Sequence, residues 1–207
     1  MSQWEADGLP AGLPPRSAGK RRRKAKAIRE LMDWIKSIVM ALIVVTILHT
    51  FVFNLSTVKG DSMQPTLQNR EWLFIYKLGY WIGSPQRGDI VILKDPDKRL
   101  HFRQYLVKRV VGLPGDRVEI RGQQLYINGS PLSEPYTDTP IMDGDFGPVV
   151  VPEGHYFVMG DNRRFMASTD SRTFQAVPEN LIKGKALFVL WPPDKIGGLY
   201  GNLPEGR

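Results

Sequence analysis

The hydrophobic positions of this chain follow two different patterns. Residues 37–58 contain no Asp, Glu, Lys or Arg, and their centre at 38–48 is rich in Val, Ile, Leu, Ala and Met. As a helix, these 22 residues would span roughly 33 Å, enough to cross a hydrocarbon core of ~30 Å. Since a buried core helix rarely lacks charges for so long, the pattern predicts a single transmembrane anchor over 37–58.

After the predicted anchor, the apolar runs become short and are separated by turn signals such as Asn128-Gly129. We find no repeat and no alternation of strand and helix patterns. The sequence therefore predicts an all-β domain over 59–207, built as a partly closed antiparallel β-sheet, with a small β excursion around 121–155. Strands are expected at 71–76, 89–93, 106–111, 117–120, 124–127, 156–160 and 186–190.

The charge distribution argues against a nucleic-acid-binding protein. The net charge is +7, but residues 1–36 carry nine Lys or Arg against four Asp or Glu, and residues 37–53 carry none of either. Most of the basicity thus precedes the apolar run, and the β domain is nearly balanced. We expect no nucleic-acid partner, and we expect the basic residues to orient a membrane segment.

The basic residues also give the predicted anchor a direction. The positive-inside rule places a basic segment over 20–36 in the cytoplasm and the β domain on the other side of the membrane. Residues 1–19, rich in Pro and Gly, are expected to form a disordered tail. A cleaved signal peptide is the alternative. We favour an uncleaved anchor in contact with membrane lipid. The basic segment comes late for a signal peptide, the apolar run is long, and no small-residue cleavage site follows it.

Composition limits the chemistry. The chain has no cysteine, so disulfides and thiolate metal sites are excluded. Its three histidines, His49, His101 and His155, have no metal-ligand spacing and no motif that couples them to a serine. We therefore expect no metal and no cofactor.

The candidate nucleophile is Ser62, in the motif G-D-S-M-Q-P-T-L. Gly60 allows a close backbone approach, and Pro65 disfavours helix at the preceding residue, so the hydroxyl is expected on a stiff extended segment. A serine needs a base, and without a suitable histidine the candidate is Lys108 in K-R-V-V-G-L-P-G-D. A loop serine and a solvated lysine are the plain alternative.

Lys108 lies in an apolar strand pattern, where it and Arg109 are expected on opposite faces, one of them toward solvent. An unperturbed lysine has a pKa of about 10.4, so only about 0.04% is neutral at pH 7. Burial lowers a lysine pKa by up to 3–5 units. A base role for Lys108 therefore requires that its side chain be buried.

These motifs resemble those of bacterial type I signal peptidases, membrane-bound Ser/Lys proteases. G-D-S-M-Q-P-T-L is similar to the nucleophile box and Y-L-V-K-R-V-V-G-L-P-G-D to the lysine box of that family. G-D-N-R at 160–163 and S-T-D-S-R at 168–172 are similar to a third block. The resemblance implies that Ser168 hydrogen-bonds the base lysine and that Asp170 and Arg172 form a supporting ion pair.

The chain departs from the family pattern in two places. The third block carries R-F-M-A between its halves, about two residues more than the usual form. At Gly60 some members have a serine that helps to stabilise the oxyanion, so here backbone N–H groups near Ser62 must contribute more.

The resemblance implies a membrane-anchored serine endopeptidase that cleaves signal peptides from exported preproteins through an acyl-enzyme. Its substrates would be secretory preproteins with small residues at the cleavage site, bound beside a strand close to the export machinery. Two alternatives remain open: a Ser/Lys maturation protease for one exported substrate, and a non-catalytic peptide-binding domain at the membrane.

Overall fold

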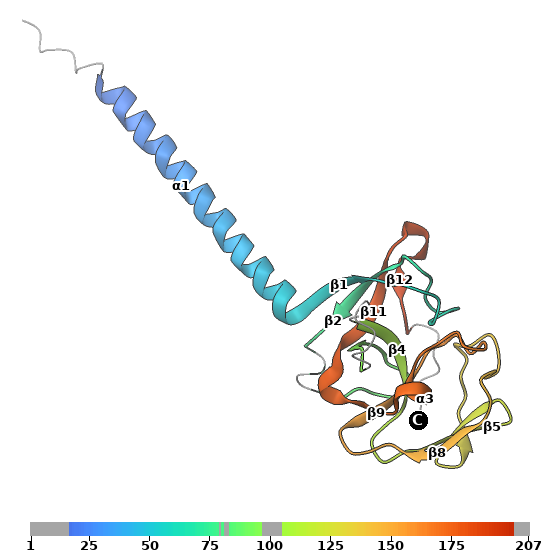
Figure 1. Cartoon of the computed structure of the whole chain (residues 1–207). Coiled ribbons are helices and arrows are strands. Elements are labelled where there is room, and N and C mark those ends of the chain that lie inside the picture. The colour runs from blue at the N-terminus through green and yellow to red at the C-terminus, as the bar shows by residue number, and fades with distance from the viewer. Residues whose placement is uncertain (1–16, 79, 81–82, 97–104, 201–207) are drawn as a thin grey trace, which may run out of the picture. The chain divides into compact units, whose positions relative to one another are not determined.

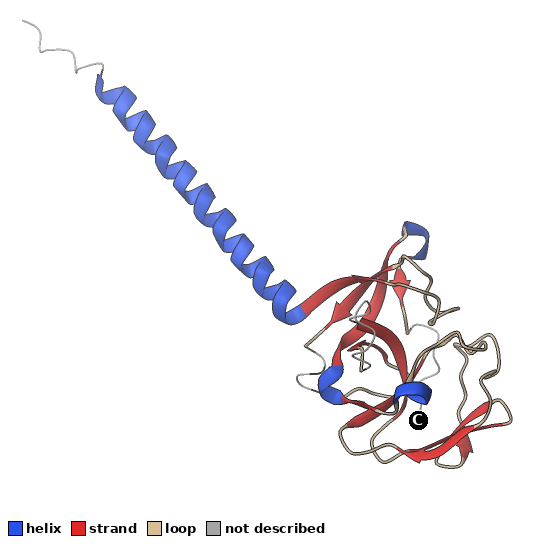
Figure 2. Ribbon diagram, in the orientation of Figure 1, coloured by secondary structure: helices blue, strands red, loops and turns tan. Residues whose placement is uncertain are grey.

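The structure is a computed structural model that describes residues 17–78, 80, 83–96 and 105–200 (Figure 1). The chain divides into two compact units between Ile47 and Leu48. The first unit is a helix and the second is built of strands (Figure 2). His101 and the predicted tail up to residue 16 lie outside the described residues.

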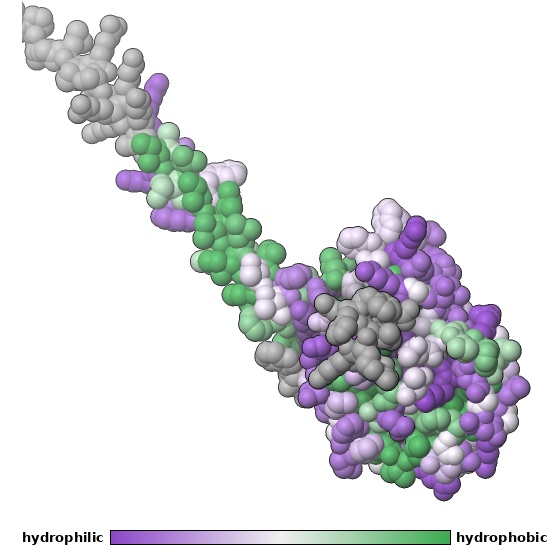
Figure 3. Space-filling view, viewed as in Figure 1, coloured by the Kyte–Doolittle hydropathy of each residue, from purple (hydrophilic) through white to green (hydrophobic). Residues whose placement is uncertain are grey.

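The first unit is helix α1 (Ser17–Ile47). By length and composition, Lys26–Val52 is a candidate membrane span, and it is the only such helix among the described residues. Figure 3 shows its apolar side chains as a nearly continuous stretch. The helix begins at Ser17, so residues 17–19 of the predicted tail are helical.

The predicted anchor is too long at its C-terminal end. A π-helical turn (Leu48–Val52) is followed by strand β1 (Phe53–Thr57), which pairs antiparallel with β2 (Trp72–Tyr76). Val58 is buried in the core of the β domain. Phe53–Thr57 is thus an edge strand of half-buried and exposed residues, and only Val58 of this uncharged stretch is buried in the core.

The second unit is almost entirely β-structure, which confirms the predicted all-β class. Besides β1 and β2, its strands are β3 (Ile90–Lys94), β4 (Tyr105–Gly112), β5 (Arg117–Arg121), β6 (Gln124–Ile127), β7 (Ser130–Pro131), β8 (Phe146–Val150), β9 (His155–Met159), β10 (Val177–Pro178), β11 (Ile182–Trp191) and β12 (Gly197–Gly198). Besides the π-helical turn, its described residues include the short helix α3 (Ser171–Phe174) and two 3₁₀ turns, Glu179–Leu181 and Pro193–Lys195.

These strands form two antiparallel sheets. The larger has the order β1-β2-β11-β3-β4-β9-β10, with β12 paired to β11, and the smaller has the order β7-β6-β5-β8. The smaller sheet corresponds to the predicted excursion around 121–155, but it begins at Arg117 and ends at Val150. The excursion is thus a separate sheet rather than an extension of the larger one.

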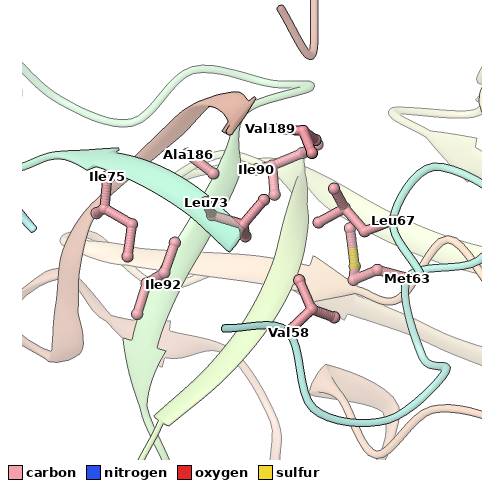
Figure 4. Packing of buried hydrophobic residues seen from close by; sticks show 9 residues of the cluster. All are labelled: Val58, Met63, Leu67, Leu73, Ile75, Ile90, Ile92, Ala186 and Val189. Atoms are coloured by element: carbon pink, nitrogen blue, oxygen red, sulfur yellow. The ribbon is translucent and has the colours of Figure 1, made fainter. Parts of the chain in front are cut away.

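A buried cluster joins the nucleophile segment to the larger sheet (Figure 4). Met63 and Leu67, 1% and 0% exposed, pack with side chains from β2, β3 and β11. Fully burying a side chain of this kind contributes about 1.5–3 kcal/mol. Met63, the residue after Ser62, therefore holds the nucleophile segment against the larger sheet.

Candidate active site

Ser62 lies in a turn rather than on the extended segment expected from the sequence. The Gln64 amide donates to the carbonyl of Asp61 at 3.1 Å, and the Leu67 amide donates to the carbonyl of Met63 at 2.9 Å. The expectation was wrong because these local backbone hydrogen bonds close a turn around the proline. The buried side chains on either side of the turn leave Ser62 facing the cleft described below.

The turn meets the middle of strand β4 at Lys108. The Nζ of Lys108 lies 2.7 Å from the Oγ of Ser62, across 46 positions of sequence. Lys108 is 3% exposed, and its strand lies between β3 and β9 in the larger sheet. The structure therefore brings the two predicted catalytic residues together and buries the lysine.

Arg109 corrects one prediction about this strand. One of Lys108 and Arg109 was expected to face solvent, but Arg109 is only 1% exposed. Its guanidinium binds both carboxylate oxygens of Asp161, at 2.8 and 2.6 Å, and donates to the carbonyl of Gly88 at 2.8 Å. Both faces of β4 are covered, and a buried carboxylate compensates the arginine charge.

Ser62 and Lys108 line a cleft with a volume of about 530 Å³. One wall is the segment 56–63, a second is the start of β4 at 105–108, and a third is formed by Met166, Ala167 and Thr169. The end of strand β1 and the start of strand β4 therefore border the cleft that contains Ser62 and Lys108.

Gly160, at the start of the third block, lies against the nucleophile turn. A Cβ at this position would lie 2.3 Å from the carbonyl oxygen of Ser62 and 2.4 Å from the Oγ of Ser168. Ser168 is thus next to the nucleophile. Its Oγ is buried, and a hydrogen bond from Ser168 helps to lower the pKa of the Asp170 carboxyl.

Asn162 fixes the nucleophile turn and was missed by the sequence analysis. Its backbone amide donates to the carbonyl of Ser62 at 3.1 Å, and its Nδ2 donates to the carbonyl of Asp61 at 3.0 Å. Asn162 is 5% exposed. The two hydrogen bonds orient the peptide groups that flank the serine. No spacing rule predicts them, because the two segments are 100 positions apart in the sequence.

Asp161 joins the same turn to β4. Besides binding Arg109, it accepts a hydrogen bond from Thr66 Oγ1 at 2.5 Å, and the Arg109 guanidinium lies 3.9 Å from the centre of the Tyr136 ring. The nucleophile turn, the lysine strand and the third block therefore share one buried polar network.

Asp170 and Arg172 form the ion pair that the resemblance implied, with contacts of 2.8 Å to each carboxylate oxygen. Burial alone would raise the pKa of Asp170, but the hydrogen bonds and charge of Arg172 outweigh it, and the pKa is lowered from its usual value. Asp170 also accepts from the Gly160 amide at 3.1 Å. The pair thus supports the glycine that touches Ser62.

The segment 134–148 supports the third block from outside. Glu134 binds Arg163 with one contact at 2.9 Å, Asp138 binds Arg164 at 2.9 Å, and Asp143 accepts from Arg172 at 2.6 Å. The sequence analysis assigned no function to this segment. The sequence does show acidic residues here and three arginines in the third block, at 163, 164 and 172, and these opposite charges pair in the structure.

Neither of the two described histidines lines the cleft that contains Ser62. His155 is held by the carbonyl of Glu153, and His49 lies in the π-helical turn. No group of three or more potential metal ligands occurs among the described residues. Gly60 has a φ of +90° and lines the cleft, with no atom within 4 Å of where its Cβ would lie.

Comparisons with known proteins give the family. The family described as signal peptidase, peptidase S26, matches residues 31–191. Signal peptidase I of Bacillus licheniformis is 42% identical over 176 residues, covering 80% of this chain and 91% of that protein. Signal peptidase I S of Bacillus subtilis is 43% identical over 175 residues, covering 79% and 91%.

A crystal structure of a signal peptidase I from Enterococcus faecalis is 38% identical, covers 50% of this chain and 97% of that one, and has a TM-score of 0.42. The family match and the curated relatives confirm the resemblance found in the motifs. The chain belongs to the signal peptidase family, peptidase S26.

Proposed function

We propose that this protein is a membrane-anchored serine endopeptidase that cleaves signal peptides from exported preproteins, with Ser62 as nucleophile and Lys108 as general base. The observation that carries the proposal is the 2.7 Å separation of the serine Oγ and the lysine Nζ. It occurs in a cleft, with the lysine buried, in a chain of the signal peptidase family.

The burial of Lys108 favours the base role because an apolar environment disfavours the ammonium relative to the neutral amine. The neutral amine takes the proton of the Ser62 hydroxyl while the Oγ bonds to the scissile carbonyl carbon. As the tetrahedral intermediate collapses, the C–N bond breaks and Lys108 gives the proton to the leaving amine. Water, deprotonated by the same lysine, then hydrolyses the ester and releases the signal peptide.

Charge develops on the carbonyl oxygen during both steps and requires hydrogen-bond donors. With glycine at position 60, we assign the backbone N–H of Ser62 to this role. The orientation of this N–H follows from Asn162, which binds the carbonyls of Asp61 and Ser62.

The supporting residues act on the lysine and the turn. We assign the buried hydroxyl of Ser168 to hydrogen-bonding Lys108 during the proton transfers. Asp170 and Arg172 hold Gly160 and thereby the approach of the third block to the serine.

The anchor places this chemistry at a membrane surface. Lys26–Val52 is long and apolar enough to span, and basic residues dominate its N-terminal side. By the positive-inside rule, the N-terminus is cytoplasmic and the β domain is extracytoplasmic. Preproteins emerging from the export machinery would then present their cleavage sites close to Ser62.

The test is processing of a purified preprotein by the wild type, Ser62→Ala and Lys108→Met. Both variants should bind the preprotein, and neither should cleave it. Full cleavage by Lys108→Met would refute the dyad. Processing of several unrelated preproteins would distinguish a general signal peptidase from a protease dedicated to one substrate. If the wild type cleaves no preprotein, the non-catalytic peptide-binding domain is the remaining alternative.

A further inference from the structure

The segment 164–167, which joins the two halves of the third block, places an exposed apolar side chain beside the reacting groups. Met166 is 80% exposed, the highest value among the large apolar residues that the structure describes. It lines the same cleft as Ser62 and Lys108. Its neighbour Phe165 is 67% exposed but does not line the cleft.

The backbone of Met166 is held in place although its side chain is not. Its φ is +53°, a conformation that residues with a side chain seldom adopt. Its amide donates to Asp143 Oδ1 at 2.7 Å, and the other oxygen of Asp143 accepts from Arg172 at 2.6 Å. The Ala167 amide closes the segment on the carbonyl of Arg164 at 3.1 Å. These contacts fix the backbone position from which the Met166 side chain reaches the cleft.

The chemistry of the side chain indicates what it contacts. Methionine is unbranched and polarisable, so it adapts to apolar groups of different shapes. A substrate bound as a strand alternates its side chains between two faces. When the small residue before the scissile bond points into the enzyme, the second residue before the bond and the first residue after it share the opposite face, toward the rim of the cleft.

We propose that Met166 is a specificity-determining residue that binds an apolar substrate side chain at one of these two flanking positions. The proposal rests on the peptidase function proposed above and adds a preference to it. The preference is independent of the small residues that precede the cleavage site.

The experiment uses the full chain in detergent micelles and four synthetic preprotein peptides. They carry Leu or Ser at the second position before the scissile bond and Leu or Ser at the first position after it. Kinetics are compared for the wild type, Met166→Asn and Met142→Asn. Asparagine tolerates a positive φ, so the first variant keeps the backbone. Met142 is the matched control because it is 53% exposed and does not line the cleft.

We expect Met166→Asn to raise KM roughly threefold to tenfold for peptides with Leu at one of the two positions, with kcat unchanged. The peptide with two serines should keep its KM, and Met142→Asn should match the wild type throughout. The position that shows the effect identifies the contact.

An equal change in KM for all four peptides, or the same change in Met142→Asn, would overturn the proposal while leaving the peptidase function intact. A wild type that cleaves none of the four peptides would overturn the proposed function and the inference with it.

Discussion

Gly160→Ala is a direct test of how closely the third block must approach the nucleophile. The added Cβ would lie 2.3 Å from the carbonyl oxygen of Ser62 and 2.4 Å from the Oγ of Ser168, whereas ordinary contact begins at 3.4 Å. Both groups, or Gly160 itself, must move by about 1 Å, and displacements of that size near a reacting atom cost about 100-fold in rate. We expect kcat to fall by about this factor.

The variant should also lose stability, because overpacking of a tight interior costs about 1–3 kcal/mol. Preprotein cleavage is therefore assayed well below the midpoint of thermal unfolding, which is measured for each variant. Gly198→Ala is the matched control, since the nearest atom to its Cβ, on Phe188, lies 3.7 Å away. The reasoning is refuted if Gly160→Ala keeps kcat within threefold of the wild type, or if the control loses as much activity.

Three further substitutions test the network around the site. Ser168→Ala should lower kcat about 10- to 100-fold, because we assign this hydroxyl to the hydrogen bond with the Lys108 ammonium that forms during proton transfer, and such a bond contributes about 1.5–3 kcal/mol. Thermal unfolding should show a smaller loss of stability, about 1 kcal/mol, because the hydroxyl also helps to stabilise the Asp170 carboxylate. Asp161→Asn should lower the unfolding free energy by about 3–5 kcal/mol in denaturant titration, because it leaves the charge of Arg109 buried and uncompensated. Asp170→Asn should destabilise most above pH 3.8, the usual pKa of this carboxyl. Since the folded-state pKa is lower, the advantage of the wild type should shrink as the pH falls below that value, as pH-dependent unfolding would show.

The sequence predicted the positions of β2, β3, β4, β5, β6 and β9 and part of β11, because each carries an apolar run between turn residues, but it did not predict β8. It did not predict β1, because Phe53–Thr57 continues the uncharged stretch of the helix and only the pairing with β2 identifies it as a strand. Composition cannot separate a membrane span from a neutral strand that follows it directly.

The candidate pair Ser62 and Lys108 was identified from motifs, and the requirement for a buried lysine followed from its protonation. The surrounding network was not predictable from these motifs. Arginine side chains are mostly exposed to solvent, but that of Arg109 is buried. Its burial depends on the ion pair with Asp161, which lies 52 positions away in the sequence. Such pairs arise from the fold, and one sequence alone does not reveal them.

The most direct measurement is the mass of the intact chain after rapid mixing with a peptide ester substrate. The account predicts that the wild type gains the mass of the acyl group and that digestion locates the adduct on Ser62. Lys108→Met and Ser62→Ala should show no adduct. Acylation of Lys108→Met at the wild-type rate, or cleavage by Ser62→Ala, would contradict the account.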